Sequence, residues 1–161
     1  MTVPLDRTQP VPAPAARGPV LRLSLTPDGS APGRLDGAWW PHSRDLVAEI
    51  PALAAELDER WGRVTRVVVN PTHWPVVPRR IPVAGRMVHV GWFLQEQDEN
   101  EMMVRSYAPW RLDLLVVPPE SSEVVAVGLM NAAADPANTR TASELLARWT
   151  TLTATSYRAP Q

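Results

Sequence analysis

The sequence has no cysteine, no lysine and a single phenylalanine among its 161 residues. Without cysteine the chain cannot form a disulfide, a thiolate metal site or a thiol redox centre. It also has no apolar run of about 18 residues, and its N-terminus lacks the basic start and apolar stretch of an export signal. These absences predict a cytoplasmic protein that does not associate with a membrane.

The charges are nearly balanced, with 16 basic residues, all of them arginine, against 17 acidic ones. Broad nucleic-acid binding usually requires a basic excess, so we expect none beyond a local patch. Arginine without lysine has two explanations. It reflects the codon bias of a GC-rich genome, or it provides planar guanidinium groups for anionic or aromatic ligands.

The chain length fits one domain, since about 160 residues can bury an adequate core without disulfide bonds or a structural metal ion. Residues 1–19 hold five prolines and little to bury, which predicts a disordered Pro-rich leader. We expect a single α+β domain over residues 20–155 and a frayed tail over 156–161.

Short β-branched or alternating apolar segments, bounded by turn residues, predict the strands. The expected strands cover residues 20–25, 35–39, 64–70, 87–94, 102–107 and 112–117. Residues 71–82 contain four prolines and predict an ordered loop or a sheet edge. Because the later strands follow one another closely, we expect them to pair as an antiparallel meander.

Apolar residues at helical spacing predict a helix from about residue 45 to residue 61. Ser43 is the expected N-cap, with Asp45 in the first turn and Gly62 as the stop. Pro51 lies inside this segment and predicts either a kink or two short helices.

The last third of the chain predicts two more helices. Ser121 is the expected cap of the first, which we favour over a strand at residues 124–130 because alanines follow. Thr141 and Glu144 form a capping box before the second. The element order is therefore ββαββββαα. It indicates an α+β fold with a mainly antiparallel sheet of about five to six strands and helices packed on one face.

Three stretches resemble an uncharacterised actinobacterial domain-of-unknown-function family. They are LDGAWWPHSRDL at residues 35–46, the Asn70 and Trp74 element, and LDLLVVPP at residues 112–119. The resemblance extends from about Leu21 to Ala134. It implies one intact domain in a bacterial cytoplasm, and it implies no chemistry.

Catalytic, metal and cofactor patterns are missing from the sequence. His42, Ser43 and Asp45 are too close together at a helix start to form a hydrolase triad. The three histidines, at 42, 73 and 89, are not paired at zinc-motif spacing, and the acidic run 96–101 lacks the pattern of a calcium loop. No glycine-rich phosphate loop or dinucleotide fingerprint occurs. We therefore expect no catalytic residue, no metal site and no cofactor.

Seven tryptophans are the strongest positive feature, and two of them are adjacent. Successive residues of a strand point to opposite faces, so only one of Trp39 and Trp40 can enter the same core. The predicted ligand-binding set is Trp39, Trp40, His42, Arg44, His73, Trp74, Arg79, Arg80 and Trp110. The structural alternative places Trp61 and Trp92 in the core, with Trp39 or Trp40 covering the sheet edge.

These features predict a non-catalytic binding or regulatory domain that engages a protein or small anionic ligand through a Trp- and Arg-rich surface. If so, alanine at Trp39 and Trp74 should leave the fold intact. One alternative is an enzyme with His42 or His73 as a general base near Asp45 or Asp36. Another is single-stranded RNA binding through exposed tryptophan with Arg79, Arg80 and Arg86.

Overall fold

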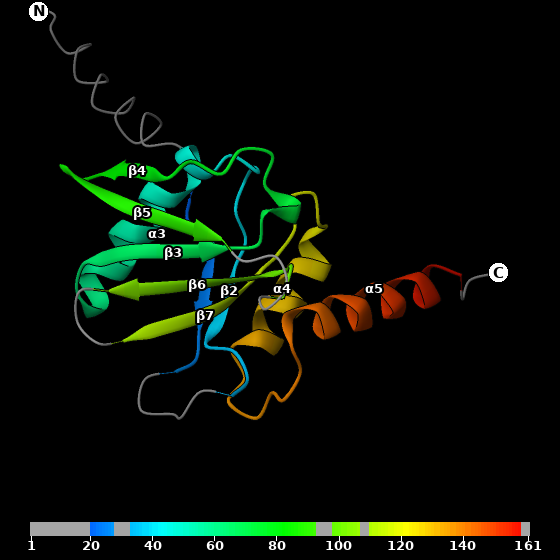
Figure 1. The fold of residues 1–161 in the computed structure, drawn as a ribbon. Coiled ribbons are helices and arrows are strands. Elements are labelled where there is room, and N and C mark those ends of the chain that lie inside the picture. Colours follow the sequence, from blue (N-terminus) through cyan, green and yellow to red (C-terminus); the bar gives the residue numbers. More distant parts are fainter. Residues whose placement is uncertain (1–19, 28–32, 93–97, 107–109, 159–161) are drawn as a thin grey trace, which may run out of the picture.

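The computed structural model describes residues 20–27, 33–92, 98–106 and 110–158 (Figure 1). Within these ranges the side chains of residues 61 and 151–158 are not described. The predicted leader, residues 1–19, lies outside the described residues.

In the described part of the chain, one sheet of seven strands is built in the order β1-β2-β7-β6-β3-β5-β4. The strands are β1 (Leu23–Leu25), β2 (Gly37–Trp39), β3 (Val64–Val69), β4 (Arg80–Val83), β5 (Arg86–Trp92), β6 (Glu101–Ser106) and β7 (Arg111–Val116). All six expected strands are present, and the α+β class is confirmed. The seventh, β4, comes from the proline-rich segment, where Pro82 is tolerated because β4 lies at the sheet edge.

The predicted antiparallel meander is wrong. Strand β3 lies between β6, to which it is antiparallel, and β5, to which it is parallel. Val67 and Val69 of this strand point into the first core, and Val68, on the other face, is still only 4% exposed. The connection through residues 70–79 is long enough to carry the chain from β3 past the position of β5 to the sheet edge, where it forms β4. The chain then returns through a tight β4–β5 turn at Ala84 and Gly85, whose φ angles are 48° and 81°.

Helix α3 (Leu46–Trp61) follows the predicted bounds but not the predicted cap. Its N-cap is Asp45, whose carboxylate accepts hydrogen bonds from the next amides, while the Ser43 hydroxyl donates to Glu49 at 2.8 Å. A carboxylate at the N-cap also meets the positive end of the helix dipole. Pro51 lies within one continuous helix rather than between two short ones, and Gly62 is the C-cap, as expected.

The two C-terminal helices are confirmed as α4 (Glu123–Ala133) and α5 (Ala142–Arg158). The N-cap of α4 is Ser122, one residue later than predicted, because it is the Ser122 hydroxyl that accepts the Val125 amide at 3.3 Å. The capping box of α5 forms as expected. The Thr141 amide donates to Glu144 at 2.9 Å, and the Glu144 amide donates to the Thr141 hydroxyl at 3.2 Å.

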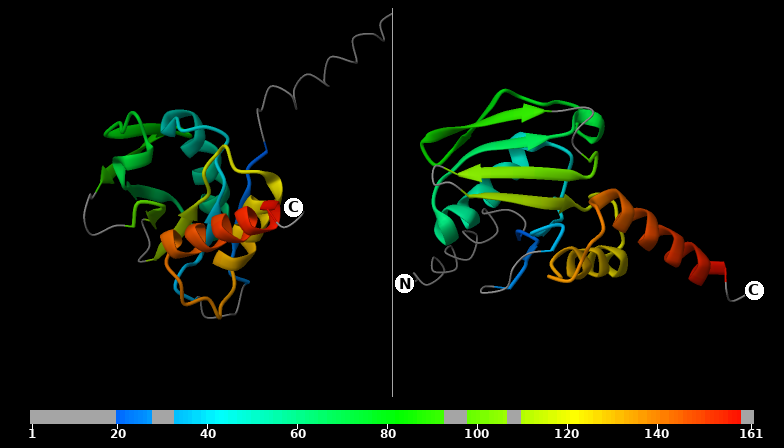
Figure 2. Two further views of the ribbon diagram at one scale, coloured as in Figure 1. Left: turned by 90° about the vertical axis from the view of Figure 1, so that its right-hand side faces the viewer. Right: turned by 60° about the horizontal axis from the view of Figure 1, so that its bottom comes forward.

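The structure has two apolar cores on opposite faces of the sheet, so the expectation that the helices share one face is wrong. The first core joins α3 to the inner side chains of β3 to β7, including Leu114. The second joins α4 and α5 to Ala38 and Leu115. Leu114 and Leu115 are successive residues of β7 and therefore point to opposite faces. Figure 2 shows α4 and α5 gathered at one end of the sheet.

Strands β3, β4, β5 and β6 are covered on only one face. Helix α3 lies behind them in Figure 1, and no described helix lies in front. The outward side chains alternate with the buried ones along β5, where Met87 and His89 are exposed while Val88 and Val90 are buried. We call this surface the open sheet face.

Candidate functional site

The indole rings of Trp39 and Trp74 stack inside the first core. Trp39 ends β2, and Trp74 follows the 3₁₀ turn η1 (Pro71–His73), which is capped by the side chain of Asn70. The ring centroids are 6.1 Å apart and the planes differ by 17°. The two residues are only 1% and 5% exposed. Neither ring presents a face to a ligand at the surface.

Trp40 points to the other face of the sheet, as the strand alternation requires, and packs in the second core. The guanidinium carbon of Arg22 lies 3.5 Å from the centroid of its ring, a cation–π contact. Arg22 also donates to the carbonyl oxygens of Trp40 and Pro41 at 3.1 and 3.0 Å. The adjacent tryptophans therefore fill two different cores.

Arg44 and His73 meet at a polar corner beside η1, while His42 lies apart. Arg44 donates to both carboxylate oxygens of Glu120, at 3.0 and 2.9 Å, and to the His73 carbonyl at 3.2 Å. The pKa of Glu120 is lowered, first by a hydrogen bond with its own backbone and then by Arg44. The exposed His42 ring instead contacts the Val20 carbonyl at 2.6 Å. This corner fixes loops to one another.

A small cavity lies in the same corner, between Arg44, His73, Trp74, Glu99 and Asn100. Its volume of about 20 Å³ is near that of a single water molecule, far below that of a metabolite pocket. Of the nine predicted ligand-binding residues, the structure brings these three, Arg44, His73 and Trp74, around one cavity.

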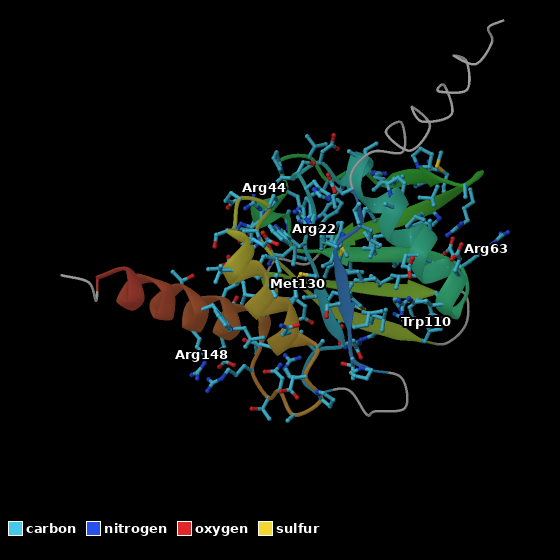
Figure 3. All side chains as sticks on the ribbon, turned by 180° about the vertical axis from the view of Figure 1, so that it is seen from behind. Arg22, Arg44, Arg63, Trp110, Met130 and Arg148 are labelled. Atoms are coloured by element: carbon cyan, nitrogen blue, oxygen red, sulfur yellow. The ribbon has the colours of Figure 1, made fainter. Side chains whose placement is uncertain are left out.

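The remaining predicted residues lie elsewhere. Arg79 and Arg80 are exposed at β4, on the sheet edge. Trp110 packs against the first core just before β7 and lies far from Arg44 (Figure 3). Trp92, expected in the core, is 49% exposed because it ends β5, beyond the cover of α3. The side chain of Trp61 is outside the described part.

The histidines do not have the geometry of a general base. The His73 Nε2 atom is 4.0 Å from the nearest oxygen of Glu99, beyond hydrogen-bond distance, and has no hydrogen-bond partner among the described atoms. No hydrogen bond joins the His42 ring to Asp45 or Asp36 in the described structure. Among the described residues, neither His42 nor His73 therefore forms a hydrogen bond to a carboxylate.

Partly buried carboxylates gather where β2, β6 and β7 meet. Asp36 accepts the Asp113 amide at 2.7 Å, and burial raises the pKa of its carboxyl group. Burial, followed by the charge of Asp113, raises the pKa of Glu101 to about 7. Within the described ranges no three histidine, aspartate or glutamate side chains are arranged to hold a metal ion.

The most distinctive polar feature is a row of four arginines and one histidine across the open sheet face, of which the sequence predicted only Arg80 as a binding residue. In the strand registers, Arg80 is opposite His89, His89 opposite Arg66, Arg66 opposite Arg105, and Arg105 opposite Arg111. Directly opposite residues share a face, and all five are exposed. We call Arg80, His89, Arg66, Arg105 and Arg111 the cationic row.

Most of the cationic row is not neutralised. Arg111 forms an ion pair with Asp113 at 3.2 Å. Arg66, Arg80 and Arg105 pair with no acidic side chain that the structure describes. A β-carbon on Gly91 would lie 3.0 Å from an Nη atom of Arg66, so the guanidinium rests over this glycine. In sequence these arginines are isolated residues within strands, and only the register aligns them.

The model of a family of unknown function, DUF5994, matches residues 22–133. The chain belongs to this family. The DUF5994 match includes every described strand together with α3 and α4, and it ends before α5. Comparison with curated proteins and with solved structures gave no match in either set. None of the helices in the described ranges is long and apolar enough to cross a bilayer.

Proposed function

We propose that this DUF5994 chain is a non-catalytic binding or regulatory domain that recognises an anionic ligand with its open sheet face. The cationic row is the observation that carries this proposal. Like charges placed directly opposite one another destabilise a sheet, so three consecutive registered arginines cost stability in the free protein. A bound anion would remove that repulsion, whereas a purely structural role would not require it.

The original ligand-binding set is revised accordingly. Arg80 belongs to the cationic row, and we retain it. The buried positions of Trp39, Trp40 and Trp74 favour a supporting role, in which the rings hold the two cores on either side of β2. The setting we propose is the cytoplasm of an actinobacterium, which the sequence resemblance and the exclusive use of arginine support.

The test is a titration with dextran sulfate, a polyanion that does not favour any class of biological ligand. The double variant Arg66→Gln with Arg105→Gln should bind roughly tenfold or more weakly, at about 1 kcal/mol for each cation removed. The matched control is Arg140→Gln with Arg148→Gln, which makes the same change in net charge at exposed positions outside the sheet, one just before α5 and one within it.

Two results would refute the proposal. The first is that the unmodified chain does not bind dextran sulfate at low salt. The second is an equal loss of affinity in both double variants, which would mean that net charge alone governs the interaction.

A further inference from the structure

We propose that the anionic ligand is the phosphodiester backbone of a single-stranded nucleic acid that crosses the sheet along the cationic row. This inference rests on the function proposed above and names its ligand. Three properties of the row carry it: its length, the chemistry of its groups, and the absence of apolar anchors among the described residues beside it.

The length of the cationic row excludes a single small anion as its full ligand. Neighbouring strands are about 4.8 Å apart, so the four steps from Arg80 to Arg111 span about 19 Å. A free phosphate or carboxylate would contact two neighbouring groups at most. Occupying the whole row requires a chain of regularly spaced anions.

The groups in the row suit phosphate. A guanidinium offers a rigid fork of donors that binds phosphate oxygens in pairs. His89, between Arg80 and Arg66, adds an imidazole that can donate to a phosphate or stack on a base. No acidic side chain occupies a position in the row. Asp113, in the adjacent register row, is already paired with Arg111.

The surface beside the row argues against an acidic protein as the ligand. The adjacent register row holds Gly91, Val68 and Met103, of which Val68 is 4% exposed and Gly91 has no side chain. Met87 is the one large apolar residue exposed on this face in the described structure, at 51%. Protein interfaces usually need a central aromatic or aliphatic anchor in a pocket. A polyanion bound through counterion release does not.

The same composition predicts little base preference. No described tryptophan or tyrosine points out from these two register rows, and Trp92 shares the inner register of β5 with Val88 and Val90. The described residues of these rows therefore lack the stacking platforms of common single-strand binding sheets. Binding should depend on the backbone and be insensitive to sequence.

The experiment is fluorescence anisotropy with a labelled 20-nucleotide oligo-dT and an oligo-rU of equal length, over a series of salt concentrations. With three to five phosphates neutralised, the slope of log K against log salt should be about −2 to −3.5. Arg66→Gln with Arg105→Gln should weaken binding roughly tenfold and make the slope shallower by about 1.4. The control variant, Arg140→Gln with Arg148→Gln, should bind as the unmodified chain does.

Competition experiments separate failure of this inference from failure of the proposed function. Polyglutamate that displaces the oligonucleotide at equal charge concentration would indicate an acidic protein ligand. Inorganic triphosphate that does so would indicate a small anion, and tighter binding of a duplex would overturn the single-strand assignment. In each case anion binding at the open face survives and the inference fails. Absence of binding to every polyanion, dextran sulfate included, would overturn both.

Discussion

At the scale of single residues, the adjacent tryptophans show how one dipeptide can stabilise two cores. Trp39 stacks on Trp74 beneath α3, while Trp40 packs against α4 and is covered by the guanidinium of Arg22. The rings point apart because strand residues alternate between faces. Their large apolar surface anchors each face of the short strand β2, which has only three residues.

Replacement of Trp74 with alanine should destabilise the protein by about 3 to 5 kcal/mol, the usual cost of removing a large buried aromatic side chain. The residue is 5% exposed and stacked on Trp39. Urea denaturation measures the change, with Trp110→Ala as a control at a half-buried position that should cost less. A loss below about 1 kcal/mol would show that the ring is not a core residue and would favour the original binding role.

Glu101 predicts a specific dependence of stability on pH. Its pKa is raised from 4.5 to about 7 in the folded protein, first by burial and then by the negative charges of Asp113 and Asp98, while Arg34 and Arg111 oppose the shift. Between these values the folded state holds a proton that the unfolded state has lost. The free energy of unfolding should therefore fall as pH rises through this window and level off above it.

Glu101→Gln should accordingly raise the melting temperature at about pH 8 and leave it nearly unchanged at about pH 5, where the folded wild-type side chain is already neutral. Thermal unfolding at several pH values measures both. Glu59→Gln, at an exposed position on α3, serves as the comparison. A stabilisation that is equal at all pH values would contradict the raised pKa.

At the scale of elements, helix α5 makes a polar contact at its start and an aromatic contact further along, in addition to its packing in the second core. Asp98, just before β6, accepts the Ser143 amide at 3.0 Å and the Ser143 hydroxyl at 2.7 Å, which caps the start of the helix from outside. Further along, the ring of Trp149 lies directly on Gly128 of α4. From there α5 extends away from the sheet (Figure 1).

The contact between Gly128 and Trp149 predicts that a glycine-to-alanine substitution in a helix lowers the stability of the protein instead of raising it. Glycine to alanine inside a helix normally stabilises it by about 1 kcal/mol. Here a β-carbon on Gly128 would overlap the ring of Trp149, so Gly128→Ala should destabilise the protein. In a Trp149→Ala background the same substitution should regain its ordinary stabilising effect. Denaturation of the four proteins of this cycle measures the coupling, and additive effects would contradict the contact.

At the scale of the whole molecule, the local signals in the sequence predicted the elements well. The strands, the α3 segment, the Gly62 stop and the Thr141–Glu144 capping box all depend on residues within a few positions of each other. The caps at Asp45 and Ser122 were misplaced by one or two positions. Several successive polar side chains could each accept a hydrogen bond from the first amides of a helix, and only the backbone geometry decides which of them is the N-cap.

The candidate site was predicted only in part, for the same reason. Arg44, His73 and Trp74 come together beside η1, but the cationic row was not visible in the sequence apart from Arg80. Its members come from five strands, and β3 joins the middle of the sheet between strands that follow it in the chain. A meander would have put different residues opposite one another.

The sequence by itself determined the α+β class, every element except β4 and the alternation that separates Trp39 from Trp40, because periodicity and caps act over short distances. The tertiary structure alone decided strand order, the use of both sheet faces and the alignment of the cationic row. Strand order depends on pairing between segments far apart in the chain and on which face each helix covers, and neither is encoded within a few residues. The cationic row, on which the proposed function rests, therefore exists only because the strand registers align its residues.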